Sequence, residues 1–261
     1  MRFTRLPILV ALVLSVSALT RAADIRVVSS GGFAAAYRTL APQFEQTTGN
    51  HLITGWGPSM GNTTDAVPQR LARNEPIDVV IMVGPALGKF VDEGKILPDS
   101  RVDLARSAIG IAVRSGTPKP DISTIDSLRT TLLNAKSIAY SDSASGVYVS
   151  TELSRRLGIV DQLTGKSRMI PAEPVGSVVA RGEAEIGFQQ ISELKPISGI
   201  ELVGPLPNEV QKITIFSAGI VTGSKEPDAA KSLITFLSSP AATQAIASSG
   251  LDPITHPDTS K

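Results

Sequence analysis

The stretch IRVVSSGGFAAAYRTLAPQFEQT, residues 25–47, decides the fold of this chain. It begins with Ile25-Arg26-Val27-Val28, a pattern typical of a short strand, and this strand stops at Ser29-Ser30-Gly31-Gly32. Helical periodicity follows over residues 33–47. The order of strand, small-residue turn and helix predicts a βα unit with the turn at the carboxyl end of its strand.

The same unit recurs along the first half of the chain. Residues 51–54 and 77–83 predict two further strands, and each is followed by a glycine-containing turn. Helical stretches come next, at residues 65–74 and 85–94. Because strands and helices alternate, we expect an α/β fold with parallel sheets covered by helices.

The alternation restarts in the second half of the chain. A strand at residues 109–113 leads into a stretch at residues 115–121 that contains Pro and Gly, and further strands and helices follow. The apolar run at residues 213–221 can return the chain to the first set of βα units. The tail from Asp252 is expected to be frayed.

Two α/β lobes joined by crossing strands, with both chain ends in one lobe, form the architecture of hinged binding proteins with an interlobe cleft. The predicted division is a signal peptide at residues 1–22, lobe 1 at residues 23–108 and 217–261, and lobe 2 at residues 109–216.

The first 22 residues have the layout of a secretory signal. Arg2 and Arg5 precede an apolar run at residues 6–19, and small residues surround the expected cleavage site after Ala22. The apolar run is shorter than the roughly 20 residues that cross a bilayer. We therefore expect removal of the signal, no membrane attachment of the mature protein, and a location in the periplasm.

The composition excludes several function classes. Without the three signal arginines, 22 basic residues stand against 24 acidic ones, a net charge of −2, and no basic cluster with interleaved aromatics indicates a nucleic-acid partner. The chain has no cysteine and only His51 and His256, so it offers neither a His/Cys metal cluster nor a cysteine nucleophile. The turn around Gly31-Gly32 does not match the dinucleotide or Walker patterns. We expect no metal and no cofactor.

Three turns carry the candidate binding groups: residues 29–32, 57–61 and 141–146, each of which combines hydroxyls with glycine before a helix. In open parallel sheets, ligands bind outside the carboxyl ends of the strands, against helix starts. The unpaired N–H groups and the dipole of a helix start attract an anion without a cationic side chain. One such turn can be an ordinary helix cap. Three at equivalent positions predict a cleft for a small anion.

At these turns the chain resembles the molybdate-binding branch of the ABC-transporter solute-binding proteins, over roughly residues 24–253. The resemblance implies a two-lobed type II periplasmic binding protein fold with a hinge and an interlobe cleft. It also implies that hydroxyls and N–H groups hold the ligand. The matching positions are Ser30, Ser59, Ser145, Gly146, Val147, Tyr148 and Val175.

The match is closer to a subgroup, the periplasmic aconitate isomerases. The segments that carry it are SSGGFAAAY at 29–37, GPSMG at 57–61, DVVIMVG at 78–84, IAYSDSASGVYV at 138–149 and GFQQISEL at 187–194. This resemblance implies an isomerase that transposes a C=C bond (aconitate delta-isomerase), interconverting trans-aconitate and cis-aconitate without a cofactor. Its ligand would be a small tricarboxylate anion.

An allylic proton shift needs a proton carrier and groups that stabilise the dienolate-like charge. Tyr148, at a helix start, is the first candidate for the carrier, with Ser30 or Ser145 assisting and Glu173 as an alternative base. A role for Tyr148 as a hydrogen-bond donor to the ligand stays open. The full predicted binding set is Ser30, Gly31, Ser59, Met60, Ser145, Gly146, Val147, Tyr148, Val175, Gln189 and Arg73.

A second function fits the same turns. A non-catalytic solute-binding protein that delivers a molybdate-like oxyanion or a carboxylate to an ABC permease would use the same hydroxyls and helix starts. The turns support both hypotheses equally, and the resemblance to the isomerases favours the enzyme.

Overall fold

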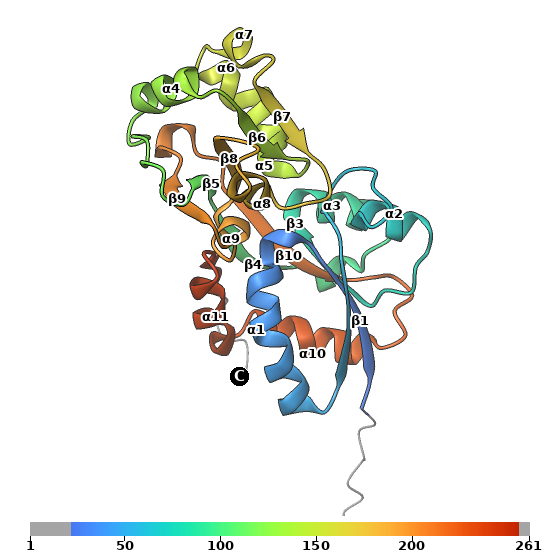
Figure 1. Ribbon diagram of the computed structural model, residues 1–261. Helices are drawn as coiled ribbons and strands as arrows, with labels where there is room; N and C mark the ends of the chain where they lie inside the picture. Colours follow the sequence, from blue (N-terminus) through green and yellow to red (C-terminus); the bar gives the residue numbers. More distant parts are fainter. Residues whose placement is uncertain (1–21, 256–261) are drawn as a thin grey trace, which may run out of the picture.

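The computed structural model describes residues 22–255, so the predicted signal up to Arg21 lies outside the described residues, as does His256. The described chain forms two α/β lobes, each built on one β-sheet (Figure 1). The predicted two-lobed α/β class is confirmed.

The first lobe is built on a six-stranded sheet of order β11-β4-β10-β3-β1-β2. Strand β1 pairs in parallel with β2 and β3, whereas β10 runs antiparallel to β3 and β4. The strands are β1 (Asp24–Ser29), β2 (His51–Trp56), β3 (Val79–Val83), β4 (Val102–Ser107), β10 (Thr214–Ile220) and β11 (Asp252–Pro253). The helices are α1 (Gly31–Thr48), α2 (Val67–Ala72), α3 (Gly84–Asp92), α10 (Pro227–Leu237) and α11 (Thr243–Ser248), with 3₁₀ turns at Pro98–Ser100 and Pro240–Ala242.

Strand β3 shows why helices cover both faces of this sheet. All five of its residues are buried. Val79, Ile81 and Val83 belong to the apolar cluster that includes α1 and α10 residues, whereas Val80 and Met82 belong to the cluster with α2 and α3. Successive side chains of a strand point to opposite faces, so a continuous apolar run requires apolar partners on both.

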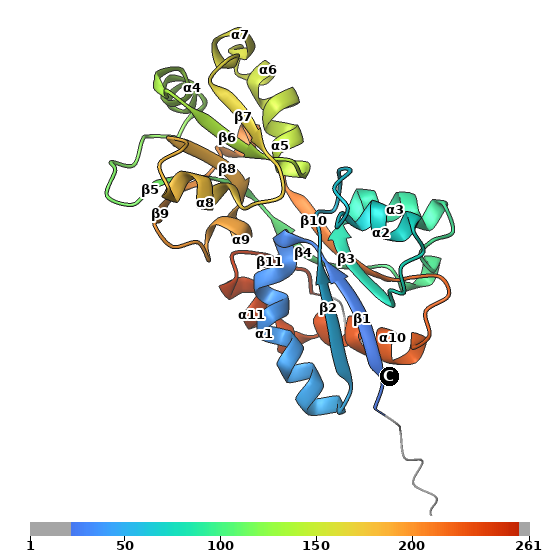
Figure 2. The same ribbon diagram turned by 45° about the vertical axis from the view of Figure 1, so that its right-hand side comes forward.

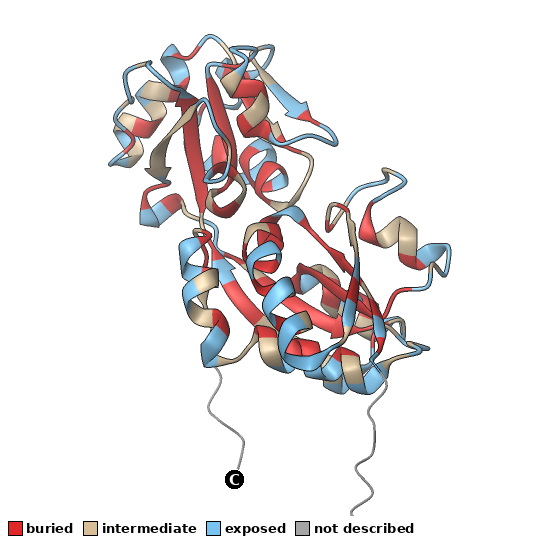
Figure 3. Cartoon of the chain, turned by 60° about the horizontal axis from the view of Figure 1, so that its bottom comes forward, coloured by how far each residue is buried: buried red, intermediate tan, exposed pale blue. Residues whose placement is uncertain are grey.

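The second lobe is built on a five-stranded sheet of order β7-β6-β8-β5-β9 and has the same layered construction (Figure 2). Its strands are β5 (Ile109–Arg114), β6 (Ile138–Ser141), β7 (Ser167–Ile170), β8 (Ile186–Gln190) and β9 (Ile200–Pro205). Its helices are α4 (Ile125–Asn134), α5 (Ala144–Tyr148), a wide π turn (Val149–Leu153), α6 (Ser154–Arg156), α7 (Val160–Leu163), α8 (Val175–Ala180) and α9 (Ile191–Leu194), with a 3₁₀ turn at Asn208–Val210. Buried residues follow the strands of both lobes (Figure 3).

The chain crosses between the lobes twice. Ala108 alone separates β4 from β5, and residues 206–213 join β9 to β10. Strand β10 begins at Thr214, ahead of the expected lobe boundary at residue 217. Strands β4, β5, β9 and β10 lie next to these crossings and pair antiparallel with neighbouring strands. The expected parallel pairs are present in both sheets, but both sheets are mixed.

The end of the chain also differs from expectation. Asp252 and Pro253 form β11, which pairs antiparallel with Arg106 and Ala105 of β4. Ile254 N–H donates to the Leu104 carbonyl at 3.0 Å. These backbone bonds hold residues 252–254 on the sheet edge, so the expectation of a frayed tail is wrong for them.

Candidate functional site

A cavity of about 250 Å³ lies between the lobes, bounded by the turns that follow β1, β2 and β6 and by the segment before α8. The start of α1 forms one wall, and α9 approaches it from the second lobe. The lining residues are Ser30, Gly31, Gly32, Trp56, Gly57, Pro58, Ser59, Asp65, Ser141, Asp142, Ser143, Ala172, Glu173, Pro174, Gln189, Glu193 and Phe216. The cleft therefore collects groups from all three turns singled out in the sequence.

The start of α1 provides unpaired donors. Ser30 precedes the helix with extended backbone, and its side chain makes no capping bond to it. The residue is 2% exposed, and its Oγ has no hydrogen-bond partner among the described residues. The N–H groups of the first helical residues, Gly31 and Gly32, have no acceptor within the helix. With the dipole of an 18-residue helix behind them, these groups form a site for a carboxylate or oxyanion oxygen.

The two glycines at this helix start are required by packing as well. A Cβ on Gly31 would collide with Glu193 Oε1, and a Cβ on Gly32 would collide with the Phe216 ring. Ser192 Oγ donates to the Gly32 carbonyl at 2.7 Å. The helix start is thus in direct contact with α9 of the second lobe.

The second turn is fixed to the end of β3. Val83 N–H donates to Ser59 Oγ at 3.0 Å, which leaves the Ser59 hydroxyl hydrogen available to the cleft. Met60 does not line the cavity. Neither does Arg73, whose guanidinium donates to the Thr64 carbonyl at 2.8 Å and pairs with Glu75 at 3.2 Å.

The third turn presents Ser141, Asp142 and Ser143 to the cavity. Ser145 lies behind them, with its Oγ 2.9 Å from Ser141 Oγ. A Cβ on Gly146 would collide with the Ser141 carbonyl, so that glycine serves the close approach of α5 to β6. Of the predicted residues on this turn and helix, Ser145, Gly146, Val147 and Tyr148 are absent from the lining.

Tyr148 points away from the cleft. Its hydroxyl donates to the Val210 carbonyl at 2.6 Å and accepts from Arg156 Nη1 at 3.2 Å, both in the second lobe. The ring is buried in the apolar core of that lobe. The structure therefore does not bring Tyr148 to the position of a proton carrier, because its helical position directs the ring inward.

Gln189 and Val175 interact with each other. Val175 N–H, at the start of α8, donates to Gln189 Oε1 at 2.9 Å. The Val175 N–H therefore has an acceptor within the protein, and Val175 does not line the cavity. Gln189 does line it, and its amide also hydrogen-bonds to the carboxyl group of Glu193.

Glu193 is one of the lining residues that the sequence did not predict, as are Asp65, Asp142 and Phe216. It stands three residues after Gln190, the residue that caps α9, and the Gln190 backbone N–H donates to its carboxyl group. Burial raises the pKa of the Glu193 carboxyl to about 7, with a further increase from the nearby Asp142 and a partial decrease from the two hydrogen bonds. A glutamate at the third position of a helix that directly follows a buried strand was the available signal.

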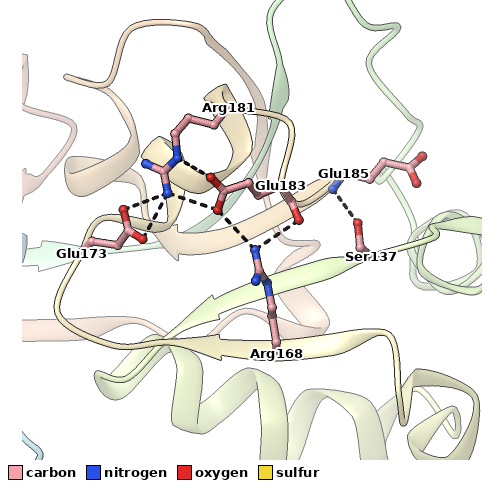
Figure 4. Close-up of polar contacts among 6 residues, drawn as sticks. All are labelled: Ser137, Arg168, Glu173, Arg181, Glu183 and Glu185. Atoms are coloured by element: carbon pink, nitrogen blue, oxygen red, sulfur yellow. Dashed lines mark hydrogen bonds and ion pairs between the residues drawn. The ribbon is translucent and has the colours of Figure 1, made fainter.

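The cavity is acidic. Asp65, Asp142, Glu173 and Glu193 line it, and the lining contains no Lys, Arg or His among the described residues. Glu173 pairs with Arg181 at 3.1 Å (Figure 4). Within residues 22–255, no group of three or more His, Asp or Glu side chains could hold a metal ion.

Arg181 also pairs with Glu183 at 2.6 Å, and Glu183 lies 3.6 Å from Arg168 (Figure 4). These side chains are about half exposed, so solvent screens the charges and the pairs contribute little to stability. The network leaves Glu173 paired with a cation, unlike Glu193.

Residues 25–252 match the family described as bacterial extracellular solute-binding protein. The chain belongs to this family. A Pseudomonas sp. protein named aconitate isomerase is 51% identical over 257 residues, which cover 97% of this chain and 98% of that protein. The molybdate-binding protein ModA of Azotobacter vinelandii is 25% identical over 240 residues, covering 88% of this chain and 90% of ModA.

Solved structures confirm the fold. The Azotobacter vinelandii periplasmic molybdate-binding protein has a TM-score of 0.71 at 22% identity, over 87% of this chain and 98% of that one. The substrate-binding domain of a putative molybdenum ABC transporter from Clostridium difficile has a TM-score of 0.68 at 19% identity, over 89% of this chain and 100% of that one. The fold is the two-lobed type II periplasmic binding protein fold. Between residues 22 and 255, no helix has the length and apolar character of a membrane span.

Proposed function

We propose that this protein is a periplasmic aconitate isomerase that interconverts trans-aconitate and cis-aconitate in the interlobe cleft. The observation that carries the proposal is the 51% identity, over 97% of the chain, to the protein named aconitate isomerase. The cleft supports it independently, because it combines donors for carboxylate oxygens with a carboxyl group, that of Glu193, whose pKa is raised by burial.

The donors suit a ligand with several carboxylates. The N–H groups at the start of α1 and the unpartnered Ser30 hydroxyl can bind one carboxylate. The hydroxyls of Ser59, Ser141 and Ser143 line the same cavity and can bind the other carboxylates. Fixed backbone and hydroxyl dipoles are preorganised, so they also stabilise negative charge that develops during a reaction.

The reaction requires only proton movement. A base breaks a C–H bond of the substrate methylene group, and the electron pair left behind spreads over the allylic system and its carboxylates. The proton then bonds to the far allylic carbon, and the double bond moves by one position. Atoms and electrons balance without an oxidant, reductant or cofactor.

The test is direct. Purified mature protein is incubated with trans-aconitate, and cis-aconitate is measured by chromatography; the expected result is conversion towards an equilibrium mixture that is also reached from cis-aconitate. Ser30→Ala tests the proposed carboxylate site in the same assay and should weaken substrate binding. Absence of conversion, with thermal stabilisation by molybdate or another oxyanion, would refute the proposal in favour of a solute receptor that serves an ABC permease.

A further inference from the structure

The isomerisation needs one group that accepts and returns a proton, and four carboxyl groups line the cleft: those of Asp65, Asp142, Glu173 and Glu193. Asp65 and Glu173 are exposed, and Glu173 is paired with Arg181. Asp142 is partly buried and accepts a long hydrogen bond of 3.4 Å from Ala172 N–H. Glu193 is partly buried too, and its hydrogen bonds come from the neutral donors of Gln189 and Gln190.

Glu193 stands beside the anion-binding helix start. Its Oε1 occupies the space that a Cβ on Gly31 would need. A substrate carboxylate held by the first N–H groups of α1 would therefore lie close to the Glu193 carboxyl, within reach of a carbon attached to that carboxylate. Proton transfer requires such direct contact between the base and the carbon acid.

We propose, on the basis of the isomerase function proposed above, that the Glu193 carboxyl carries the proton between the two allylic carbons of the substrate. The carboxylate takes the proton from the methylene carbon, so that an O–H bond forms as the C–H bond breaks. The same O–H then delivers a proton to the far allylic carbon and restores the carboxylate. One carboxyl group can serve both carbons because a single carbon atom separates them.

The carboxyl group is held in place for this task. Gln189 joins it to the start of α8, since the same amide accepts from Val175 N–H. The bond from Ser192 Oγ to the Gly32 carbonyl fixes α9 against α1. Both ends of the proposed contact, the helix start and the base, therefore belong to one hydrogen-bonded unit, as a preorganised site requires.

Its proton affinity matches the role. Burial raises the pKa of the Glu193 carboxyl to about 7, so near neutral pH it exists in both the accepting and the donating form. The other ionisable groups that line the cavity are the carboxyls of Asp65, Asp142 and Glu173, and the last of these faces Arg181. The Arg181 guanidinium is thus paired with carboxylates other than that of Glu193.

A purely structural role for Glu193 predicts a different result. A glutamate at this helix position caps the backbone N–H of Gln190, and glutamine caps it equally well. Glu193→Gln therefore keeps the cap and removes only the base. Glu209→Gln, an exposed change in the same lobe, is the matched control.

The experiment compares the mature protein with these two variants, using trans-aconitate as substrate for turnover and as ligand in calorimetry. We expect Glu193→Gln to lower kcat by about 100-fold to 10,000-fold, with Kd for trans-aconitate within about tenfold of the parent value. Glu209→Gln should retain parental turnover. If Glu193→Gln binds substrate and keeps more than about a tenth of the parental kcat, Glu193 is not the proton carrier. That result leaves the isomerase function standing, because the parent protein is active in the same experiment.

Inactivity of the parent protein overturns the isomerase function and this inference with it. If Glu193→Gln does not fold, the role of Glu193 is tested by the kcat of Glu193→Asp and by the pH dependence of kcat/KM in the parent protein. The parent kcat/KM should rise with pH through about 7, because the base must be ionised. Glu193→Asp, with its carboxyl group drawn back by one methylene, should lose about 10-fold to 100-fold in kcat. A flat profile together with full activity of Glu193→Asp overturns the proposal.

Discussion

Glu193→Gln is expected to stabilise the substrate-free protein at alkaline pH and to have little effect near pH 5. The carboxyl has a pKa of about 7 in the folded protein, against a reference value of 4.5. Between these values the folded protein holds a proton that the unfolded chain has released. The contribution of Glu193 to stability is therefore fully present below 4.5 and is lost as the pH rises through about 7.

The size of the effect follows from this pKa difference. An increase from 4.5 to about 7 corresponds to about 3 kcal/mol, and the residual exposure of the side chain reduces the expected effect to about 2 kcal/mol. Glutamine has no charge to desolvate, so the variant should gain this amount on the parent between pH 5 and pH 8. For a chain of this size the gain corresponds to about 4–8 °C in Tm.

The assay is thermal or urea unfolding of the parent and Glu193→Gln in parallel at several pH values from 5 to 8. The comparison isolates Glu193, because both proteins share every other titrating group. Glu209→Gln should follow the parent throughout. A stability difference that does not grow with pH would refute the argument that burial of this carboxyl raises its pKa.

Three further changes test the rest of the site. Gly32→Ala should destabilise the protein by about 1–3 kcal/mol in urea unfolding, because the added Cβ would collide with the Phe216 ring. Unchanged stability would contradict the packing described for this helix start. Tyr148→Phe removes the hydrogen bond to the Val210 carbonyl, so it should lower the free energy of unfolding by about 1 kcal/mol while kcat stays near the parental value. A large fall in kcat in a folded variant would show that Tyr148 takes part in the reaction. Ser30→Ala should raise Kd for trans-aconitate by about 3-fold to 30-fold, measured by calorimetry. Its Tm should be unchanged or slightly higher, because the Ser30 hydroxyl has no hydrogen-bond partner in the described chain. A marked fall in Tm with an unaltered Kd would show that Ser30 has a structural role.

Much of the fold was predictable because it depends on local patterns. The β-branched run at residues 25–28, the small-residue turn and the following helix form one unit, and its recurrence determines the α/β class. The apolar run of β3 already indicates helices on both faces. The strands β4 and β9 were not predicted. Several of their residues are partly exposed, and their pairing comes from residues far away in the chain.

The sequence by itself determined which turns carry hydroxyls and glycines, and Ser30, Gly31, Ser59 and Gln189 do line the cleft. It could not determine which way a side chain on a helix points. Tyr148 and Glu193 both stand near the start of a helix after a buried strand, but the first ring is directed into the core of its lobe and the second carboxyl into the cleft. That difference follows from how α5 and α9 pack, and above all from the contact of α9 with α1, whose residues are separated by about 160 positions in the chain. Burial raises the pKa of Glu193, and the start of α1 from the other lobe lies against this carboxyl, so this property of the site comes from the tertiary structure.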